Sequence, residues 1–423
     1  GHFAFASEVR ALLSAGFIPA RLNLDGVCNF LMYQSCAAPM TVLEGIQQLM
    51  PGTFARYRGG KLEKTGYWKL EAPGPVLEAA RPEAVRSEIR RLLSASVERR
   101  MVSDVPLGAF LSGGIDSSAV VGLMAQCSAQ PVNTFSVTFR EPEFDESEYS
   151  SAIARRFNTR HTPIPLGASD FLSSFEDALA AMDNPSGDGI NTYLVSRATK
   201  AAGITVSLSG IGGDELFAGY DNFKRWTRLH RQSFWHLPAG LRRGSGQVLH
   251  MAARSARMER LAELVAAPGP GIEHIYPSLR QVLSYHRAKS LLCLSGSPSD
   301  PVRQQLCSRK TQLADLPLLS QYTAAELLGY TSNVLLKDTD QMSMASALEV
   351  REPFFDHELI EYMLRVPDEI KYPAYPKQLL VESLAPLLPD SIVHRPKKGF
   401  TFPWKHWLRH ELKGWCQGNL ERL

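Results

Sequence analysis

Residues 111–118, Leu-Ser-Gly-Gly-Ile-Asp-Ser-Ser, combine the residue types that bind a phosphate group. Two glycines follow an apolar run, and hydroxyls and a carboxylate come where a helix is expected to begin. Glycines let a backbone approach an oxyanion closely, and the N–H groups and dipole of a helix N-terminus favour negative charge. A plain strand-to-helix turn capped by Ser117 is the alternative, but it needs neither two glycines nor three serines around an acid. Because Asp116 would repel a phosphate unless a cation lay between them, the segment predicts a phosphate site with Mg²⁺ on Asp116.

A second glycine-rich segment, residues 209–214, reads Ser-Gly-Ile-Gly-Gly-Asp and follows a short apolar run at 204–208. Ligands gather at the carboxyl ends of parallel strands, so Asp214 is expected at the same edge of a sheet as Asp116. An aspartate after two glycines is also common in turns, which leaves a capping or surface role for Asp214 open.

These two segments lie where strand and helix patterns alternate. Strands are expected at 105–111, 132–139, 162–166 and 204–208, with helices at 119–124, 147–157 and 171–182. Such alternation is typical of βαβ crossovers, in which helices cover a parallel sheet. Beyond Tyr220 the pattern is helical at 258–267, 322–348, 357–364 and 377–387, and no further strand is expected. The predicted fold class is α/β, a parallel sheet with a helical C-terminal region.

The start of the chain differs from this pattern. Residues 1–70 read as short strands and turns with one helical stretch, and residues 71–82 are rich in Pro and Ala, as linkers are. We therefore expect a small domain at 1–70, a linker at 71–82 and a larger domain at 83–423.

Composition excludes several classes of protein. The 423 residues are 44% hydrophobic and carry a net charge of +3, too small for a general field that binds nucleic acid or a membrane. Apolar runs end before the ~18 residues needed to span a bilayer, and no signal peptide is apparent. The six cysteines form no Cys-x-x-Cys pair, which is typical of reduced thiols. A cytoplasmic protein is expected, with neither nucleic acid nor membrane as a partner.

The motifs of several other enzyme classes are absent from the sequence. It contains no Walker A motif, no G-x-G-x-x-G after a strand, no G-x-S-x-G and no H-E-x-x-H. Walker-type ATPases, Rossmann dehydrogenases, α/β-hydrolases and zinc proteases are therefore poor fits.

The string from Ser112 to Ser118 resembles the SGGxDSS loop of the PP-loop ATP pyrophosphatases, which split ATP between its α and β phosphates. Other segments resemble the successive signatures of glutamine-dependent asparagine synthetases: residues 5–13, 49–52, 209–220, 337–342, 347–356 and 396–400. The resemblance covers essentially the whole chain. It implies a PP-loop (adenine nucleotide alpha hydrolase-like) synthetase domain, preceded by the closing part of a glutaminase domain of the α+β Ntn-hydrolase, or amidotransferase, type.

The resemblance assigns nucleotide binding to the two glycine segments. Asp116 and Asp214 would hold the Mg²⁺ ions that bridge the triphosphate oxygens. The residues that would contact ATP are Leu111, Ser112, Gly113, Gly114, Asp116, Ser117, Ser118, Val137, Ser209 and Gly210. Leu111 and Val137 are apolar strand residues that are expected to be buried in any case.

Three lysines and a glutamate complete the set implied by the resemblance. Lys377 matches a lysine that contacts the α-phosphate, where a fixed cation stabilises charge as pyrophosphate leaves. Lys397 and Lys398 resemble a clamp on the pyrophosphate, and solvated lysines are the alternative for all three. Glu349 matches a glutamate that β-lactam synthetases pair with a tyrosine. It lies in an apolar run, so we expect it to be buried and functional or neutralised by Arg351.

Two departures from the family pattern bear on function. The glutaminase depends on an N-terminal cysteine, whereas this chain begins Gly1-His2 and its first cysteine is Cys28. Glutamine hydrolysis is therefore not expected from these residues. Asparagine synthetases usually carry an acid at the position of Ile211, and an isoleucine cannot accept a proton.

The resemblance implies an ATP-dependent amide-forming ligase that uses ATP and Mg²⁺. A small-molecule carboxylate, aspartate in the family, would attack the α-phosphorus, release pyrophosphate and form an acyl-adenylate, which ammonia or glutamine-derived nitrogen would amidate. One alternative, supported by Ile211, is a related synthetase, β-lactam-synthetase-like or another amidotransferase, that acts on a different carboxylate. The other, a non-catalytic nucleotide-binding protein, is disfavoured because Asp116, Asp214 and Lys377 are present. A homodimer remains open.

Overall fold

The computed structural model describes residues 3–395 and 402–421. Its centre is a five-stranded parallel sheet with the strand order β5-β4-β3-β6-β7. The strands are β3 (Leu107–Phe110), β4 (Asn133–Thr138), β5 (Arg160–Pro165), β6 (Val206–Leu208) and β7 (Glu349–Arg351). Helices α4 (Ile115–Cys127), α5 (Ser147–Arg156), α6 (Ala168–Ala181) and α7 (Gly189–Ala201) connect β3 to β4, β4 to β5 and β5 to β6. The α/β fold expected from the alternating pattern is confirmed.

One strand departs from the expectation. No strand was expected beyond Tyr220, yet β7 pairs in parallel with β6, with Val206 opposite Glu349 and Leu208 opposite Arg351. Three residues are too short for a periodic signal. The strand forms because its backbone N–H and C=O groups pair with those of β6, which lies about 140 residues earlier in the chain.

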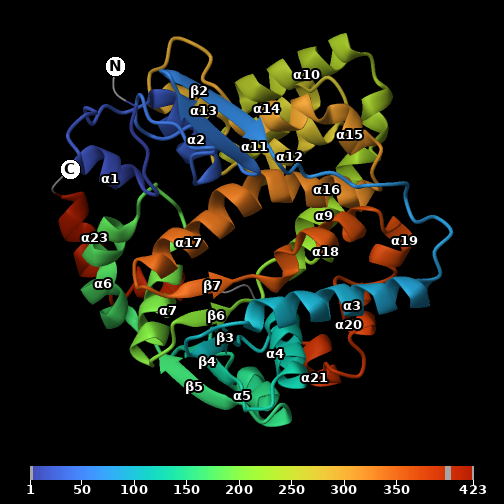
Figure 1. Cartoon of the computed structure of the whole chain (residues 1–423). Helices are drawn as coiled ribbons and strands as arrows, with labels where there is room; N and C mark the ends of the chain where they lie inside the picture. The colour runs from blue at the N-terminus through green and yellow to red at the C-terminus, as the bar shows by residue number, and fades with distance from the viewer. Residues whose placement is uncertain (1–2, 396–401, 422–423) are drawn as a thin grey trace.

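Helices surround the sheet and form a second body beside it (Figure 1). The long helix α3 (Pro82–Met101) runs along the sheet. The remaining helical segments are α8 (Gly213–Leu216), α9 (Asp221–His230), η1 (Ser233–His236), α10 (Ala239–Ala252), α11 (Ala256–Ala266), α12 (Ile272–Arg280), α13 (Tyr285–Leu291), α14 (Pro301–Ser308), α15 (Lys310–Ala314), α16 (Leu318–Glu326), η2 (Leu327–Leu335), α17 (Leu336–Met344), η3 (Pro353–Phe355), α18 (His357–Leu364), α19 (Asp368–Lys371), α20 (Gln378–Ser383), α21 (Asp390–Val393), α22 (Trp404–Trp407) and α23 (Lys413–Leu420). The helix expected at 377–387 ends early, at Ser383, because the following Pro386 cannot continue it.

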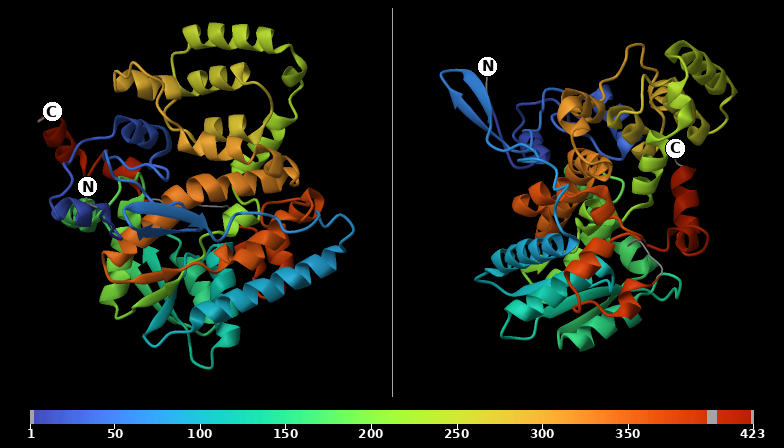
Figure 2. Two further views of the ribbon diagram at one scale, coloured as in Figure 1. Left: turned by 45° about the horizontal axis from the view of Figure 1, so that its top comes forward. Right: turned by 90° about the vertical axis from the view of Figure 1, so that its right-hand side faces the viewer.

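The first part of the chain contains α1 (Val9–Ser14), α2 (Leu24–Tyr33) and an antiparallel hairpin of β1 (Thr53–Arg58) and β2 (Lys61–Gly66). Two helices stand where one helical stretch was expected. The hairpin projects from the body of the molecule (Figure 2, right), and nearly all of its residues are exposed. In the parts of the chain that the structure describes, no helix is both long and apolar enough to cross a membrane.

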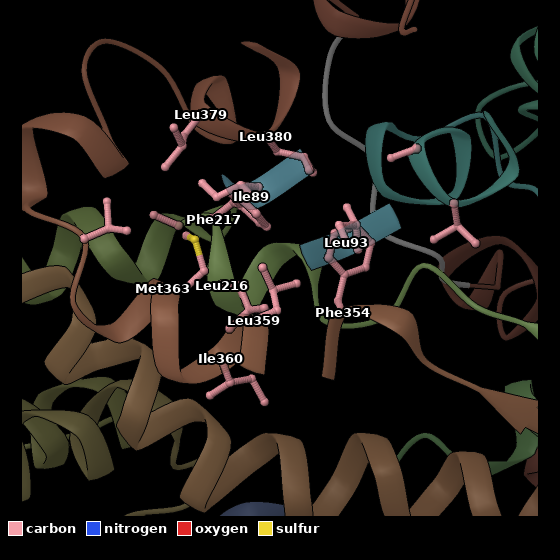
Figure 3. Close-up of a cluster of buried hydrophobic side chains, with 14 of the residues drawn as sticks. Ile89, Leu93, Leu216, Phe217, Phe354, Leu359, Ile360, Met363, Leu379 and Leu380 are labelled. Atoms are coloured by element: carbon pink, nitrogen blue, oxygen red, sulfur yellow. The ribbon is translucent and has the colours of Figure 1, made fainter. Parts of the chain in front are cut away.

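The core cluster in Figure 3 supports the segments that carry the expected site residues. Leu216 and Phe217, which closely follow Asp214, are fully buried, and the Phe217 ring meets that of Phe354 at 6.1 Å. Leu379 and Leu380, which closely follow Lys377, are buried in the same cluster. Burial of each such side chain stabilises the fold by about 1.5–3 kcal/mol. The core thereby fixes the backbone next to both charged residues.

A buried lysine, Lys371, lies at the end of α19, six positions before Lys377. Its Nζ donates a hydrogen bond to Ser320 Oγ at 2.5 Å. Burial lowers the pKa of Lys371 to about 7, although the nearby Asp368 carboxylate acts in the opposite direction. Folding therefore lowers the pH at which this side chain loses its proton.

Candidate active site

The first glycine segment forms a tight loop between β3 and α4. Gly113 has a φ of +71°, and a Cβ placed on it would lie 2.6 Å from the backbone N of Ser150. Only glycine satisfies both the left-handed backbone and this close approach to α5. The Ser112 and Ser117 hydroxyls lie 3.0 Å apart, and the N–H of Gly114 donates to Ser112 Oγ at 3.2 Å. The loop thus holds its serines next to the N-terminus of α4, as the phosphate-site prediction requires.

The second glycine segment packs directly against the first. A Cβ on Gly210 would lie 2.6 Å from the backbone N of Ser117, and one on Gly213 would lie 2.2 Å from Asp116 Oδ1. Because no side chain fits at either position, the two loops approach more closely than ordinary residues allow. The carboxyl ends of the neighbouring strands β3 and β6 therefore present one continuous surface.

Three charged side chains meet on this surface. Lys377 Nζ donates to Asp214 Oδ1 at 2.7 Å and to Asp116 Oδ2. Burial alone would lower the pKa of Lys377, but the two carboxylates outweigh burial and raise its pKa above the usual value. The structure thus brings together Asp116, Asp214 and Lys377, which are separated by up to 261 positions.

The backbone around Lys377 explains why this lysine reaches the aspartates. Its φ is +63°, an uncommon left-handed conformation for a residue with a side chain, and its N–H donates to Phe217 O at 3.1 Å. The Lys377 side chain passes Gly219, where an added Cβ would lie 2.5 Å from Lys377 Cε. The backbone is therefore shaped to direct the ammonium group between the two carboxylates.

The donor set also fits a divalent cation. Two carboxylates from neighbouring strand ends converge on one point, and carboxylate oxygens are the ligands that Mg²⁺ prefers. The Lys377 ammonium group already places a positive charge between them. Asp116 and Asp214 are thus suited to hold Mg²⁺ beside a bound phosphate chain.

The residues expected near the base and ribose lie at the same sheet edge. Leu111 and Ser209 are buried and Val137 is half-buried. The Ser209 N–H donates to Arg351 O at 2.9 Å, which places the start of the second glycine segment beside the end of β7. Ile211 follows directly, and its N–H donates to Ser209 Oγ at 3.2 Å.

Arg395 is a site residue that the sequence reasoning missed. Its guanidinium pairs with Glu146 at 2.9 Å and lies 4.7 Å from the centre of the Tyr149 ring. A Cβ on Gly114 would be 3.5 Å from Arg395 Nη2, so this cation borders the first glycine loop. Its place directly before the motif at 396–400 is the signal that could have identified it. The expected clamp residues Lys397 and Lys398 lie outside the described residues.

Of the two expectations for Glu349, burial is wrong, and neutralisation by Arg351 is what the structure shows. Its side chain is 53% exposed and pairs with Arg351 at 2.7 Å. Alternation along β7 explains this, because Val350 faces the core and Glu349 and Arg351 face the other way. Glu349 is opposite Val206, at the amino end of β6, and thus about 10 Å along the strands from Ser209. The structure does not bring Glu349 into the Asp116–Asp214–Lys377 group.

Glu352 follows β7 at its carboxyl end and was not anticipated. Burial raises the pKa of Glu352 to about 7, with Arg100 acting to lower it and Asp340 to raise it. Because Glu352 directly follows β7, which pairs with β6, its backbone lies at the same sheet edge as both glycine segments. Its position three residues after Glu349, immediately before Pro353, offered no distinctive sequence signal.

A buried polar network supports the helix that carries Asp214. Tyr220 Oη donates to Glu215 Oε1 at 2.8 Å, and Thr323 Oγ1 donates to the Glu215 carbonyl at 2.9 Å. Burial raises the pKa of Glu215 to about 7, and the neighbouring Asp214 carboxylate adds to the rise. These bonds connect α8 to α16 and so fix the orientation of Asp214.

Models of two protein families match the sequence. The sequence model for asparagine synthase matches residues 88–423, and the one for a glutamine amidotransferase domain matches residues 1–68. A putative glutamine-hydrolyzing asparagine synthetase of Mycobacterium tuberculosis (strain H37Rv) is 28% identical, over 98% of this chain and 64% of the relative. Asparagine synthetase (glutamine-hydrolyzing) 1 of Bacillus subtilis (strain 168) is 26% identical, over 99% of this chain and 65% of the relative. The chain therefore spans just under two thirds of the length of these relatives.

A solved NH3-dependent NAD synthetase of Campylobacter jejuni shares 15% identity, with a TM-score of 0.24 over 33% of this chain and 61% of that one. That overlap is too small to support an argument. The match at residues 88–423 covers well over half of the sequence and contains both glycine segments and Lys377. The chain belongs to the asparagine synthase family.

Proposed function

We propose that this chain carries the synthetase half of an ATP-dependent amide-forming ligase of the asparagine synthetase type. The observation that carries the proposal is the convergence of Asp116, Asp214 and Lys377 between two glycine segments at adjoining strand ends. In this proposal residues 83–423 form the synthetase domain, residues 71–82 the linker and residues 1–70 the closing part of a glutaminase domain.

The substrates in this proposal are ATP, a carboxylate and a nitrogen nucleophile. The N–H groups of the first glycine loop and of the α4 N-terminus bind phosphate oxygens, and Asp116 and Asp214 would hold Mg²⁺, which would supply positive charge beside the triphosphate. A substrate carboxylate oxygen attacks the α-phosphorus, the bond from that phosphorus to the β-bridging oxygen breaks, and pyrophosphate leaves. The Lys377 ammonium, fixed before substrate binds, stabilises the negative charge on the α-phosphate.

The second step forms the amide. Ammonia attacks the acyl carbon, the C–N bond forms, and the C–O bond to AMP breaks. The nitrogen must lose a proton, and Ile211 cannot accept it. We assign this role to Glu352, because its pKa of about 7 suits a base at neutral pH and it follows the strand beside Ser209. Ammonia is supplied free or from glutamine.

The test is product analysis with the purified chain. We expect ATP, Mg²⁺, aspartate and ammonium to yield AMP, pyrophosphate and asparagine in equal amounts. Aspartate labelled with ¹⁸O in the side-chain carboxylate should transfer one label to AMP, since that oxygen stays on phosphorus when the amide forms. Asp116→Ala should abolish pyrophosphate release, whereas the exposed control Glu349→Gln should preserve it. Formation of ADP and phosphate would refute the proposal, and turnover with another carboxylate alone would assign the chain to a related synthetase.

A further inference from the structure

A cluster of metal-binding side chains lies outside the proposed active site. Glu141, His406 and Glu411 each offer one ligand atom, and these atoms all lie within 4.8 Å of one another. Glu141 belongs to the loop between β4 and α5, whereas His406 and Glu411 belong to the C-terminal segment that includes α22. The cluster therefore joins two parts of the chain that are more than 260 positions apart.

The two carboxylate oxygens of Glu141 differ in their surroundings. Its Oε1 accepts a hydrogen bond from Trp407 Nε1 at 2.6 Å, while its Oε2 is buried and has no hydrogen-bond partner among the described residues. A buried carboxylate oxygen without a partner is unfavourable, because it has lost its hydrogen bonds to water. His406 Nε2 lies 3.3 Å from Glu411 Oε1, so the other two ligands already point toward each other.

Aromatic packing fixes the backbone on both sides of the cluster. Phe139, at the start of the β4–α5 loop, meets Trp407 at 6.4 Å and Phe402 at 5.7 Å between ring centres. Trp404 meets Phe171 of α6 at 4.8 Å in an edge-to-face contact. Glu141 and His406 are therefore held near each other by the core and not only by their own charges.

We propose that Glu141, His406 and Glu411 bind one divalent transition-metal ion, with Zn²⁺ as the best fit. An imidazole with two carboxylates suits Zn²⁺ and its neighbours, whereas Mg²⁺ and Ca²⁺ take oxygen ligands. Ligand atoms at about 2.0–2.2 Å from one ion are at most about 4.4 Å apart. The cluster must contract slightly, and the His406 and Glu411 side chains, 46% and 44% exposed, are free to rotate. Water, or His410, whose ring centre lies 4.5 Å from that of His406, completes the coordination.

The bound ion would act as a structural link. The β4–α5 loop also contains Glu146, which pairs with Arg395 beside the first glycine loop. A metal at Glu141 therefore attaches the C-terminal residues 402–420 to the same loop that borders the proposed active site. It supplies a cross-link in the folded chain that the unfolded chain lacks, so it stabilises the docked C-terminal segment.

The experiment measures metal binding without substrate. The chain is stripped with EDTA and titrated calorimetrically with Zn²⁺, Mg²⁺ or Ca²⁺ in separate runs, and the Co²⁺ absorption spectrum reports coordination by nitrogen and oxygen ligands. We expect one Zn²⁺ per chain, at least tenfold weaker binding in His406→Ala and in Glu141→Gln, and unchanged binding in the matched control His357→Ala on α18. Zn²⁺ should also slow tryptic cleavage after Arg409 and Lys413 in the parent chain but not in His406→Ala.

Several results would overturn the proposal. One is the absence of saturable Zn²⁺ binding, and another is a Co²⁺ spectrum dominated by sulfur ligands. A third is full affinity in both His406→Ala and Glu411→Gln, with circular dichroism spectra equal to the parent. Because no readout uses ATP or turnover, this test stands apart from that of the ligase activity.

Discussion

Replacing Lys377 by methionine removes the charge between Asp116 and Asp214 but keeps a chain of similar length. Removing one partner of a buried ion pair costs about 3–5 kcal/mol, because the remaining charge stays desolvated. The side chains of Asp116 and Asp214 are 17% and 19% exposed, so we expect a loss at the lower end of this range. The free energy of unfolding should fall by about 3 kcal/mol. Loss of a positioned charge at the reacting phosphate should also slow pyrophosphate release about 10²–10³-fold.

The assay separates these two effects. Urea unfolding of the parent and of Lys377→Met is measured with and without Mg²⁺, alongside pyrophosphate release. Mg²⁺ at 100 times its dissociation constant stabilises the folded state by about 2.7 kcal/mol, so most of the lost stability should return while turnover does not. The control is Lys64→Met, because Lys64 is exposed and makes a hydrogen bond of 3.3 Å to Gln47. We expect that substitution to change neither quantity.

Two outcomes would refute this reasoning. If Lys377→Met unfolded at the parent's urea concentration without Mg²⁺, the ammonium would not be balancing the two carboxylates. If it released pyrophosphate at the parent rate, Lys377 would not act on the reacting phosphate.

Three further predictions follow from named contacts. Gly210→Ala should weaken ATP binding at least tenfold in equilibrium dialysis, because its Cβ would meet the first glycine loop, whereas Gly240→Ala, with open space around it on α10, should retain full binding. The rate of amide formation should rise with pH through about 7 as the Glu352 carboxyl ionises. Glu352→Gln should lose this rise and about 10²–10⁴ in rate, while Glu352→Asp and the control Glu349→Gln should keep the pH profile. An unchanged profile in Glu352→Gln would remove Glu352 from the mechanism. The pKa of Lys371 is about 7 in the folded chain and about 10.4 in the unfolded chain. Between these two pH values the unfolded state holds one more proton, so the free energy of unfolding should rise with pH. Urea unfolding at pH 7, 8 and 9 should show this slope in the parent and lose it in Lys371→Met, and equal slopes would contradict a neutral buried lysine.

The strongest sequence predictions came from local patterns. Glycines beside hydroxyls and an acid indicate a phosphate loop because the requirement acts over a few bonds, and the structure gives Gly113 a left-handed backbone that suits glycine. The alternation of apolar runs likewise predicted the sheet from β3 to β6, since each crossover is encoded by neighbouring residues. Glu349 shows the limit of such reasoning: an apolar run predicted burial, but a three-residue edge strand turned its side chain outward.

By itself, then, the sequence determined the α/β class, the two glycine segments with Asp116 and Asp214, and the family. Only the tertiary structure decided that Lys377 joins those aspartates, that Arg395 borders the first glycine loop, that Glu352 is buried, and that Glu141 meets His406. The physical reason is that a local pattern reports interactions within a few residues, whereas these groups are brought together by strand order and core packing. Strand pairing and side-chain burial depend on partners hundreds of positions away, and no window of sequence contains both members of such a pair.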